Sequence, residues 1–186
     1  ARADQFAVER IQRREQRRRQ LHREAPWLPP ACRLAEDGED RLVIAGHNVF
    51  QESTDGGTTW TDIPADLPSL DIHAFAQSAV DPERMWAYVA GGGLYASTDG
   101  GTRWSEAYTG DIVGLVAVSD EGADVLLGID PFEGLVRSAD GGVTWTPAGK
   151  PPTSPVASLV ATPDGRTILL GGTDGLYRSD DGGATW

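Results

Sequence analysis

An eight-residue string recurs four times in this chain and constrains its fold more than any other feature. The string reads STDGGTTW at 53–60, STDGGTRW at 97–104, SADGGVTW at 138–145 and SDDGGATW at 179–186. The leading serines stand at 53, 97, 138 and 179, so the intervals between them are 44, 41 and 41 residues. A fixed period of this length is the signature of a repeat architecture. The chain is therefore predicted to consist of repeated structural units.

Three short apolar segments precede each string. In the second unit they are DIHAFAQS at 71–78, RMWAYVAG at 84–91 and GGLYAS at 92–97, with the turn-forming VDPER at 80–84 between the first two. Asp, Pro and Gly favour turns, and the segments are rich in β-forming residues. The string supplies a final turn and a last strand. Four short antiparallel strands per period of about 40–45 residues indicate a β-propeller blade, so we predict an all-β propeller of four-stranded antiparallel blades.

Each recurring string is predicted to be a structural hairpin. Its paired glycines accept positive φ without steric cost, its Asp and Ser can cap N–H groups of the turn, and its Trp opens the last strand and buries apolar area between blades. A calcium site is disfavoured because each string has at most two carboxylates, and we expect neither metal nor cofactor. The residues given this structural role are Ser53, Asp55, Gly57, Trp60, Ser97, Asp99, Gly101, Trp104, Ser138, Asp140, Gly142, Trp145, Ser179, Asp181, Gly183 and Trp186.

The string S-x-D-G-G-x-T-W resembles the Asp-box, or BNR repeat, over residues 30–186. Three of the four copies have the Thr-Trp ending, and the second has Arg103-Trp104 instead. This repeat occurs in sialidases, sortilin-type receptors, some glycoside hydrolases and photosystem II assembly factors. The resemblance implies a hairpin between the third and fourth strands of a blade, at the periphery and away from the active face. It also favours an extracytoplasmic or cell-surface location, but fold alone does not give function.

The first 25 residues differ in charge from the rest of the chain. Residues 1–24 hold eight arginines and four acidic residues, a net charge of +4, whereas residues 25–186 hold eight basic and twenty-four acidic residues, a net of −16. Residues 1–25 are predicted to form a basic helix or a disordered arm that ends before Pro26, with the charge to contact an acidic surface. No nucleic-acid contact is expected for the acidic propeller.

Residues 26–186 are predicted to hold three full blades and a fourth that stops short. The blades run over about 30–70, 71–110, 111–153 and 154–186. The fourth ends at Trp186, where its last strand should begin, and an open sheet edge invites association. We therefore expect a fragment of a propeller with six or more blades, and a closed ring of four blades is the alternative.

Ligands are expected on the face opposite the strings, which the second-to-third-strand loops and the connections between blades should form. This face is expected to hold several charged residues: Asp66, Asp71, Asp111 and Lys150. It also holds the candidate ligand contacts. The alternative is that the acidic candidates are simply solvated loop residues and the histidine of the strand an ordinary strand residue. These candidates are His47, His73, Asp130, Phe132, Glu133 and Asp174.

Two classes of function fit this pattern. The first is a non-catalytic propeller that recognises a protein or carbohydrate ligand or scaffolds an assembly, and it is preferred. The alternative is a sialidase-like or other glycoside hydrolase. A sialidase would need a central arginine cluster for the substrate carboxylate, a Tyr–Glu pair and an acid–base Asp. The early Arg-Ile-Pro motif of sialidases is absent, and no catalytic set is recognised, so catalytic residues would lie largely outside this chain.

Overall fold

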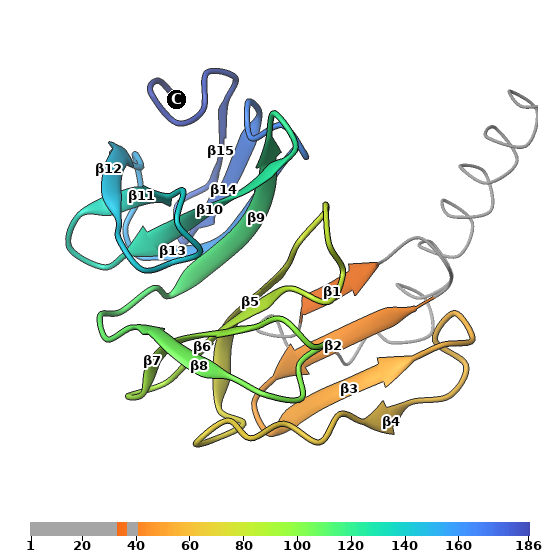
Figure 1. Ribbon diagram of the computed structural model, residues 1–186. Helices are drawn as coiled ribbons and strands as arrows, with labels where there is room; N and C mark the ends of the chain where they lie inside the picture. Colours follow the sequence, from red (N-terminus) through yellow and green to blue (C-terminus); the bar gives the residue numbers. More distant parts are fainter. Residues whose placement is uncertain (1–32, 37–40) are drawn as a thin grey trace, which may run out of the picture.

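Fifteen β-strands and no helix make up the part of the chain that the computed structural model describes, residues 33–36 and 41–186 (Figure 1). The strands form four sheets, each ordered as in the sequence. The strands are β1 (Arg33–Glu36), β2 (Leu42–Gly46), β3 (Val49–Ser53) and β4 (Thr61–Asp62); β5 (Ile72–Gln77), β6 (Met85–Val89), β7 (Gly93–Ser97) and β8 (Ser105–Tyr108); β9 (Gly114–Asp120), β10 (Ala123–Asp130), β11 (Gly134–Ser138) and β12 (Thr146–Gly149); and β13 (Val156–Ala161), β14 (Ile168–Gly172) and β15 (Leu176–Ser179).

The predicted all-β class and the antiparallel order within each blade are confirmed, since every strand pair in the four sheets is antiparallel. One detail was wrong. The tryptophans of the strings do not open the last strand, because β8 begins at Ser105 and β12 at Thr146, one residue later. The arm predicted for residues 1–25 lies outside the described residues. Within the described part, no helix is long and apolar enough to cross a membrane.

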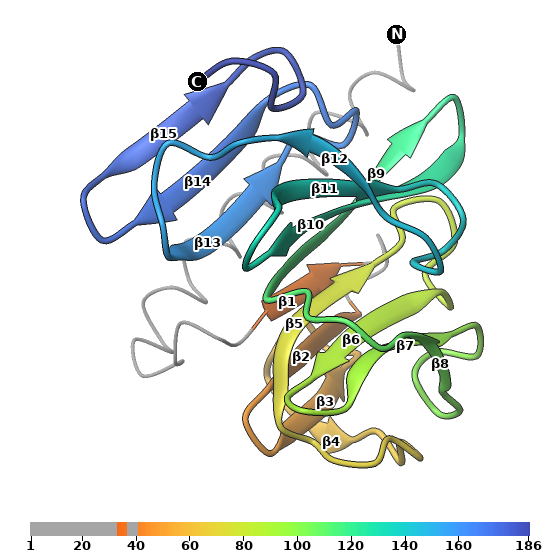
Figure 2. The same ribbon diagram turned by 90° about the vertical axis from the view of Figure 1, so that its left-hand side faces the viewer.

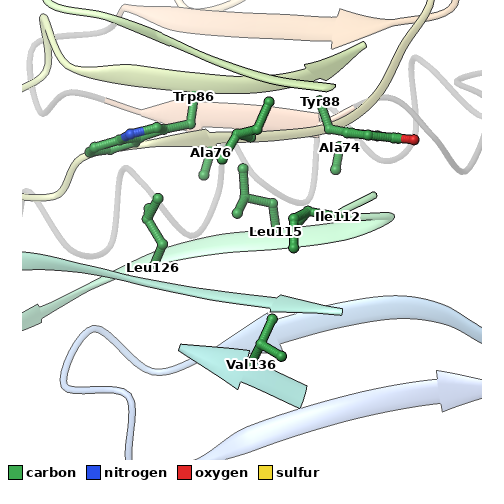
Figure 3. Close-up of a cluster of buried hydrophobic side chains, with 9 residues drawn as sticks. Ala74, Ala76, Trp86, Tyr88, Ile112, Leu115, Leu126 and Val136 are labelled. Carbon is green, nitrogen blue, oxygen red and sulfur yellow. The ribbon is translucent and has the colours of Figure 1, made fainter. Parts of the chain in front are cut away.

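The four sheets follow one another side by side in chain order, as the two views in Figures 1 and 2 show. Their first strands contact one another, β1 with β5, β5 with β9 and β9 with β13. Three buried apolar clusters fill the three seams between neighbouring sheets. In the middle seam, Trp86 and Tyr88 of β6 face Leu115 of β9 and Leu126 of β10 (Figure 3). Burial of such side chains contributes about 1.5–3 kcal/mol each, so these seams hold the blades together.

The Asp-box is a turn held by hydrogen bonds among its own side chains and backbone. In the third copy, Ser138 Oγ donates to Asp140 Oδ1 at 2.8 Å and accepts from Gly142 N at 2.9 Å. Asp140 Oδ1 accepts from Thr144 N, and Asp140 Oδ2 accepts from the Thr144 hydroxyl. Trp145 Nε1 donates to Gly142 O at 3.0 Å. Both carboxylate oxygens therefore accept hydrogen bonds from within the turn.

The second glycine of the second, third and fourth boxes packs against the preceding blade. Gly142 has a φ of 94°, and a Cβ added there would lie 2.7 Å from Leu94 Cδ2. A Cβ at Gly101 would lie 2.6 Å from Phe50 Cζ, and one at Gly183 would collide with Leu135. Only glycine fits both the positive φ and this close approach. The repeated box glycine is therefore also a contact between neighbouring blades.

The fourth sheet exposes an apolar face that the other three sheets bury. Leu94, Leu135 and Leu176 occupy equivalent positions in the third strands of the second, third and fourth sheets. Their partners on the second strands are Tyr88, Ile129 and Gly171. Leu94 and Leu135 are 0% exposed, but Leu176 is 74% exposed. Val160 and Leu169, which pair with each other on β13 and β14, are exposed as well. We call Val160, Leu169 and Leu176 the open face. An exposed seam surface of this kind is consistent with a segment of a larger propeller.

The box carboxylates should make the protein sensitive to acid. Hydrogen bonds from the Thr144 side chain and backbone and from Ser138 lower the pKa of Asp140 to about 2, below the value of about 3.9 for an unfolded Asp. A depressed folded pKa gives stability that is present above about pH 4 and lost as the pH falls toward 2. Asp55 and Asp181 also have a pKa of about 2. The melting temperature should therefore fall over this window.

Asp140→Asn tests this assignment. The substitution removes an ionised acceptor from the turn, so the melting temperature at pH 7 should drop, and its further fall between pH 4 and pH 2 should be smaller than in the wild type. Thermal unfolding followed by circular dichroism at a series of pH values measures both effects. An Asp140→Asn variant with the same acid-dependent fall as the wild type would contradict the role of this carboxylate.

Candidate functional site on the loop face

The ends of the blades opposite the boxes form a surface that we call the loop face. It consists of the β2–β3, β6–β7, β10–β11 and β14–β15 loops and the ends of the connections next to β5, β9 and β13. Asp66, which the sequence placed on this face, lies instead at the box end, where its N donates to Thr102 O and its Oδ1 accepts from Trp104 N. In an antiparallel blade the second-to-third-strand loop and the third-to-fourth-strand turn lie at opposite ends. The loop face is therefore separated from the box turns by the length of the strands.

Two histidines and an aspartate meet on the loop face where the first blade joins the second. His47 Nδ1 lies 2.5 Å from Asp71 Oδ1, and His73 Nε2 lies 3.3 Å from the same oxygen. The two imidazole rings contact each other edge to face, with centroids 4.6 Å apart. The three side chains are between 41% and 49% exposed. We call His47, Asp71 and His73 the His–Asp–His cluster.

The backbone around the cluster is tied across the seam between the blades. His47 and Asp71 form an isolated antiparallel bridge, and Asn48 N donates to Leu70 O at 2.8 Å. Asp71 O accepts from Ala90 N at 3.0 Å, so three loops are joined at this point. Ile72, the residue after Asp71, is buried in the core at 1% exposure. The positions of the three side chains are thus set by the fold rather than by a free loop.

The charges within the cluster favour an ionised carboxylate. The hydrogen bond from His47 lowers the pKa of Asp71 below its ordinary value, with a smaller contribution from the charge of His73. One donor atom from each of the three residues lies within 4.8 Å of the other two. Such a group can orient an imidazole as a base or hold a cation between its donor atoms.

A second aspartate occupies the same place at the next seam. Asp111 and Ile112 stand before β9 as Asp71 and Ile72 stand at the start of β5. Asp111 Oδ1 accepts from the Tyr88 hydroxyl at 2.5 Å. Burial and this hydrogen bond raise the pKa of Tyr88 to about 12. The repeated Asp-Ile pair therefore ties the connection to the neighbouring blade.

The candidate Asp174 is also held by hydrogen bonds. It accepts from the Thr153 hydroxyl at 2.5 Å and from the Tyr177 hydroxyl at 2.9 Å. These bonds lower the pKa of Asp174. Its carboxylate fixes the β14–β15 loop to the connection that carries Thr153.

Asp130, Phe132 and Glu133 lie together at the β10–β11 loop. Asp130 Oδ1 accepts from Phe132 N at 2.7 Å and from Glu133 N at 2.9 Å, so this carboxylate shapes its own turn. The Phe132 side chain is 89% exposed. An aromatic ring in this position offers an apolar contact to a ligand.

The structure thus divides the candidate residues into three groups. His47 and His73 come together with Asp71, whereas Asp130, Phe132 and Glu133 share one loop of another blade, and Asp174 belongs to the fourth blade. Sequence reasoning placed Asp71 on this face but did not connect it with the histidines. It missed the hydroxyl partners Tyr88, Thr153 and Tyr177. The repeated Asp-Ile pair at 71–72 and 111–112 was the signal available for the first of these.

Comparison with known proteins gives one curated relative and several solved structures. No family model matches the chain. The photosystem II assembly lipoprotein Ycf48 of Synechococcus sp. (strain CC9902) is 32% identical over 74 residues, 39% of this chain and 22% of that protein. A GH74 enzyme from Niastella koreensis has a TM-score of 0.61 at 19% identity, covering 82% of this chain and 28% of the enzyme. The structure of YCF48 bound to D1 peptide has a TM-score of 0.53 at 18% identity, covering 78% and 53%.

These likenesses confirm the resemblance to Asp-box β-propeller proteins and the propeller fold. The two structural likenesses, at 19% and 18% identity, bear on the fold alone. The match spans about a fifth of the Ycf48 lipoprotein of Synechococcus, at 22% of its length, and about half of the solved YCF48 chain, at 53%.

Proposed function

We propose that this chain is part of a non-catalytic β-propeller that binds a segment of a partner protein on the loop face and so acts as an assembly scaffold. The observation that carries the proposal is the sequence similarity to a photosystem II assembly lipoprotein, 32% over 74 residues. The solved structure of YCF48 with a D1 peptide adds that a propeller of this fold binds a polypeptide segment.

The hydrogen bonds of Asp111 and Asp174 support a rigid binding surface. Glycoside hydrolysis by the usual route needs two carboxylates on either side of the scissile bond. On this face Asp111 accepts from Tyr88, and Asp174 accepts from Thr153 and Tyr177. Each of these carboxylates stabilises a connection between strands. The same residues therefore keep the loops in a fixed shape, which lowers the ordering cost of binding a ligand.

The surface chemistry indicates the kind of segment that would bind. The loop face carries an exposed aromatic ring at Phe132, and its acidic residues are Asp71, Asp111, Asp130, Glu133 and Asp174. Aromatic residues are enriched at interfaces, and complementary charge favours a basic partner. We therefore propose an extended segment that carries an apolar residue for Phe132 and at least one Lys or Arg.

Selection from a displayed library of random peptides on the wild-type chain tests the proposal. Selected peptides should contain an apolar residue near a basic one, and Phe132→Ser should weaken their binding at least tenfold in fluorescence anisotropy. The matched control is Val143→Ser, because Val143 is an exposed apolar residue of a box turn. Its substitution should leave affinity unchanged.

Two results would count against the proposal. Equal losses in Phe132→Ser and Val143→Ser would place the peptides elsewhere on the surface. Release of sugar from a polysaccharide or a fluorogenic sialoside by this chain would favour the glycoside hydrolase alternative. The D1 peptide is a further probe, since it is the peptide in the solved YCF48 complex.

A further inference from the structure

We propose that the His–Asp–His cluster is a binding site for one divalent transition-metal ion of the Zn²⁺ class. The site is a property of His47, Asp71 and His73 alone, and it does not depend on the proposed scaffold function. It revises the expectation of no metal, which was drawn from the box strings and not from the opposite face of the blades.

The arrangement of the donor atoms carries the proposal. Nδ1 of His47 and Nε2 of His73 converge on the same carboxylate oxygen of Asp71, at 2.5 Å and 3.3 Å. One donor atom of each residue lies within 4.8 Å of the others. Zinc binds His nitrogen and carboxylate oxygen at about 2.0–2.2 Å, in a tetrahedron whose ligands are roughly 3.4 Å apart. Small side-chain rotations therefore bring the three donors around one ion.

The chemistry of the donors selects the kind of metal. Two imidazoles and one carboxylate suit Zn²⁺, Cu²⁺ or Ni²⁺, whereas Mg²⁺ and Ca²⁺ prefer oxygen donors. Three protein ligands leave a fourth tetrahedral position open, as in zinc sites that accept water or a ligand group. The exposure of 41–49% of each side chain gives an ion access from solvent.

The repeat itself does not require the histidines. By their spacing from the box serines, the positions of the other blades that match His47 hold Gly91, Phe132 and Thr173. The position that matches His73 after the repeated Asp-Ile pair holds Val113. Two of the three histidines in the chain nevertheless meet at one point. The aspartate has a structural counterpart in Asp111, but the two imidazoles beside it serve no role that the other blades share.

The backbone holds the donor residues in place before any ion binds. His47 and Asp71 form an antiparallel bridge across the seam between the first two blades. The backbone bonds between Asn48 and Leu70 and between Ala90 and Asp71 hold the two sides of the cluster in place. A rigid donor set reduces the cost of assembling the site on metal binding.

Titration of the full chain with Zn²⁺ by calorimetry, in the presence of excess Mg²⁺, tests the proposal. One equivalent should bind, and His47→Gln and His73→Gln should each weaken binding at least tenfold, because removal even of groups that only support a ligand costs 10–100-fold. The matched control is His22→Gln, which removes the third histidine and should leave the affinity as in the wild type. Co²⁺ in place of Zn²⁺ should give the visible absorption of a tetrahedral site.

Three outcomes would overturn the site. These are no uptake of Zn²⁺ by the wild type, equal affinity in all four proteins, or weakening by only one of the two substitutions in the cluster. Circular dichroism without metal separates loss of a ligand from loss of the fold. Little change in melting is expected because both histidines lie at the surface, at 49% and 41% exposure. Restoration of metal-free spectra by a chelator completes the test.

Discussion

Gly142→Ala should destabilise the protein by roughly 2–5 kcal/mol, although it adds a single methyl group. The residue has a φ of 94°, which costs a non-glycine residue about 1–2 kcal/mol. Its added Cβ would lie 2.7 Å from Leu94 Cδ2 and 3.3 Å from Leu126 Cδ1, and overpacking of a core costs about 1–3 kcal/mol more. Urea unfolding monitored by tryptophan fluorescence measures the loss.

Gly141→Ala is the matched control for this prediction. Gly141 has a φ of 79°, but the nearest atom to an added Cβ is Arg84 Nη2 at 3.9 Å. This variant should therefore lose only the free energy of unfolding that a positive φ costs a non-glycine residue, about 1–2 kcal/mol. A Leu94→Ala background removes the closer of the two contacts, so the extra cost of Gly142→Ala over Gly141→Ala should shrink. Equal losses from the two glycines in the wild-type background would show that the contact between blades is unimportant.

The fold of this chain could be predicted from its sequence because every blade carries the same local signals in the same order. The short apolar segments rich in β-forming residues predicted the strands, and the Asp-Gly-Gly turns predicted the hairpins. The dual role of the box glycines could not be predicted. Their positive φ follows from the turn, but the contact of Gly142 with Leu94 depends on how far one blade is rotated against the next. That rotation is a property of packing, not of local sequence.

The candidate site could be predicted only as a face. Strand direction placed His47, Asp71 and the β10–β11 loop at the end of the blades opposite the boxes. The meeting of His47 with Asp71, 24 residues later, required the register of the seam between two blades. The β2–β3 loop leaves only His47 and Asn48 between its strands, and Asn48 has a φ of 58°. This tight turn aims His47 at the next blade, and no periodicity in the sequence reports it.

The open face should make the isolated chain self-associate. Val160, Leu169 and Leu176 occupy positions that the other blades bury in their seams, and Leu176 is 74% exposed. Apolar area of this kind is stabilised by about 25 cal/mol per Å² when it is removed from water, and contiguous apolar patches mark interaction sites. Sedimentation velocity of the wild-type chain should show a concentration-dependent dimer or larger species.

Leu169→Glu combined with Leu176→Glu should convert the protein to a monomer at the same concentrations. Both side chains are exposed in the single chain, so their replacement removes little of the core, whereas two carboxylates buried in an interface would be desolvated without partners. Phe132→Glu is the matched control, because Phe132 is the most exposed large apolar residue of the described chain and lies on the loop face. If Phe132→Glu also abolished association, contact would occur through scattered apolar residues. Dissociation by the Leu169 and Leu176 changes alone would show that the fourth blade associates through the surface that its three predecessors use to pack against their neighbours.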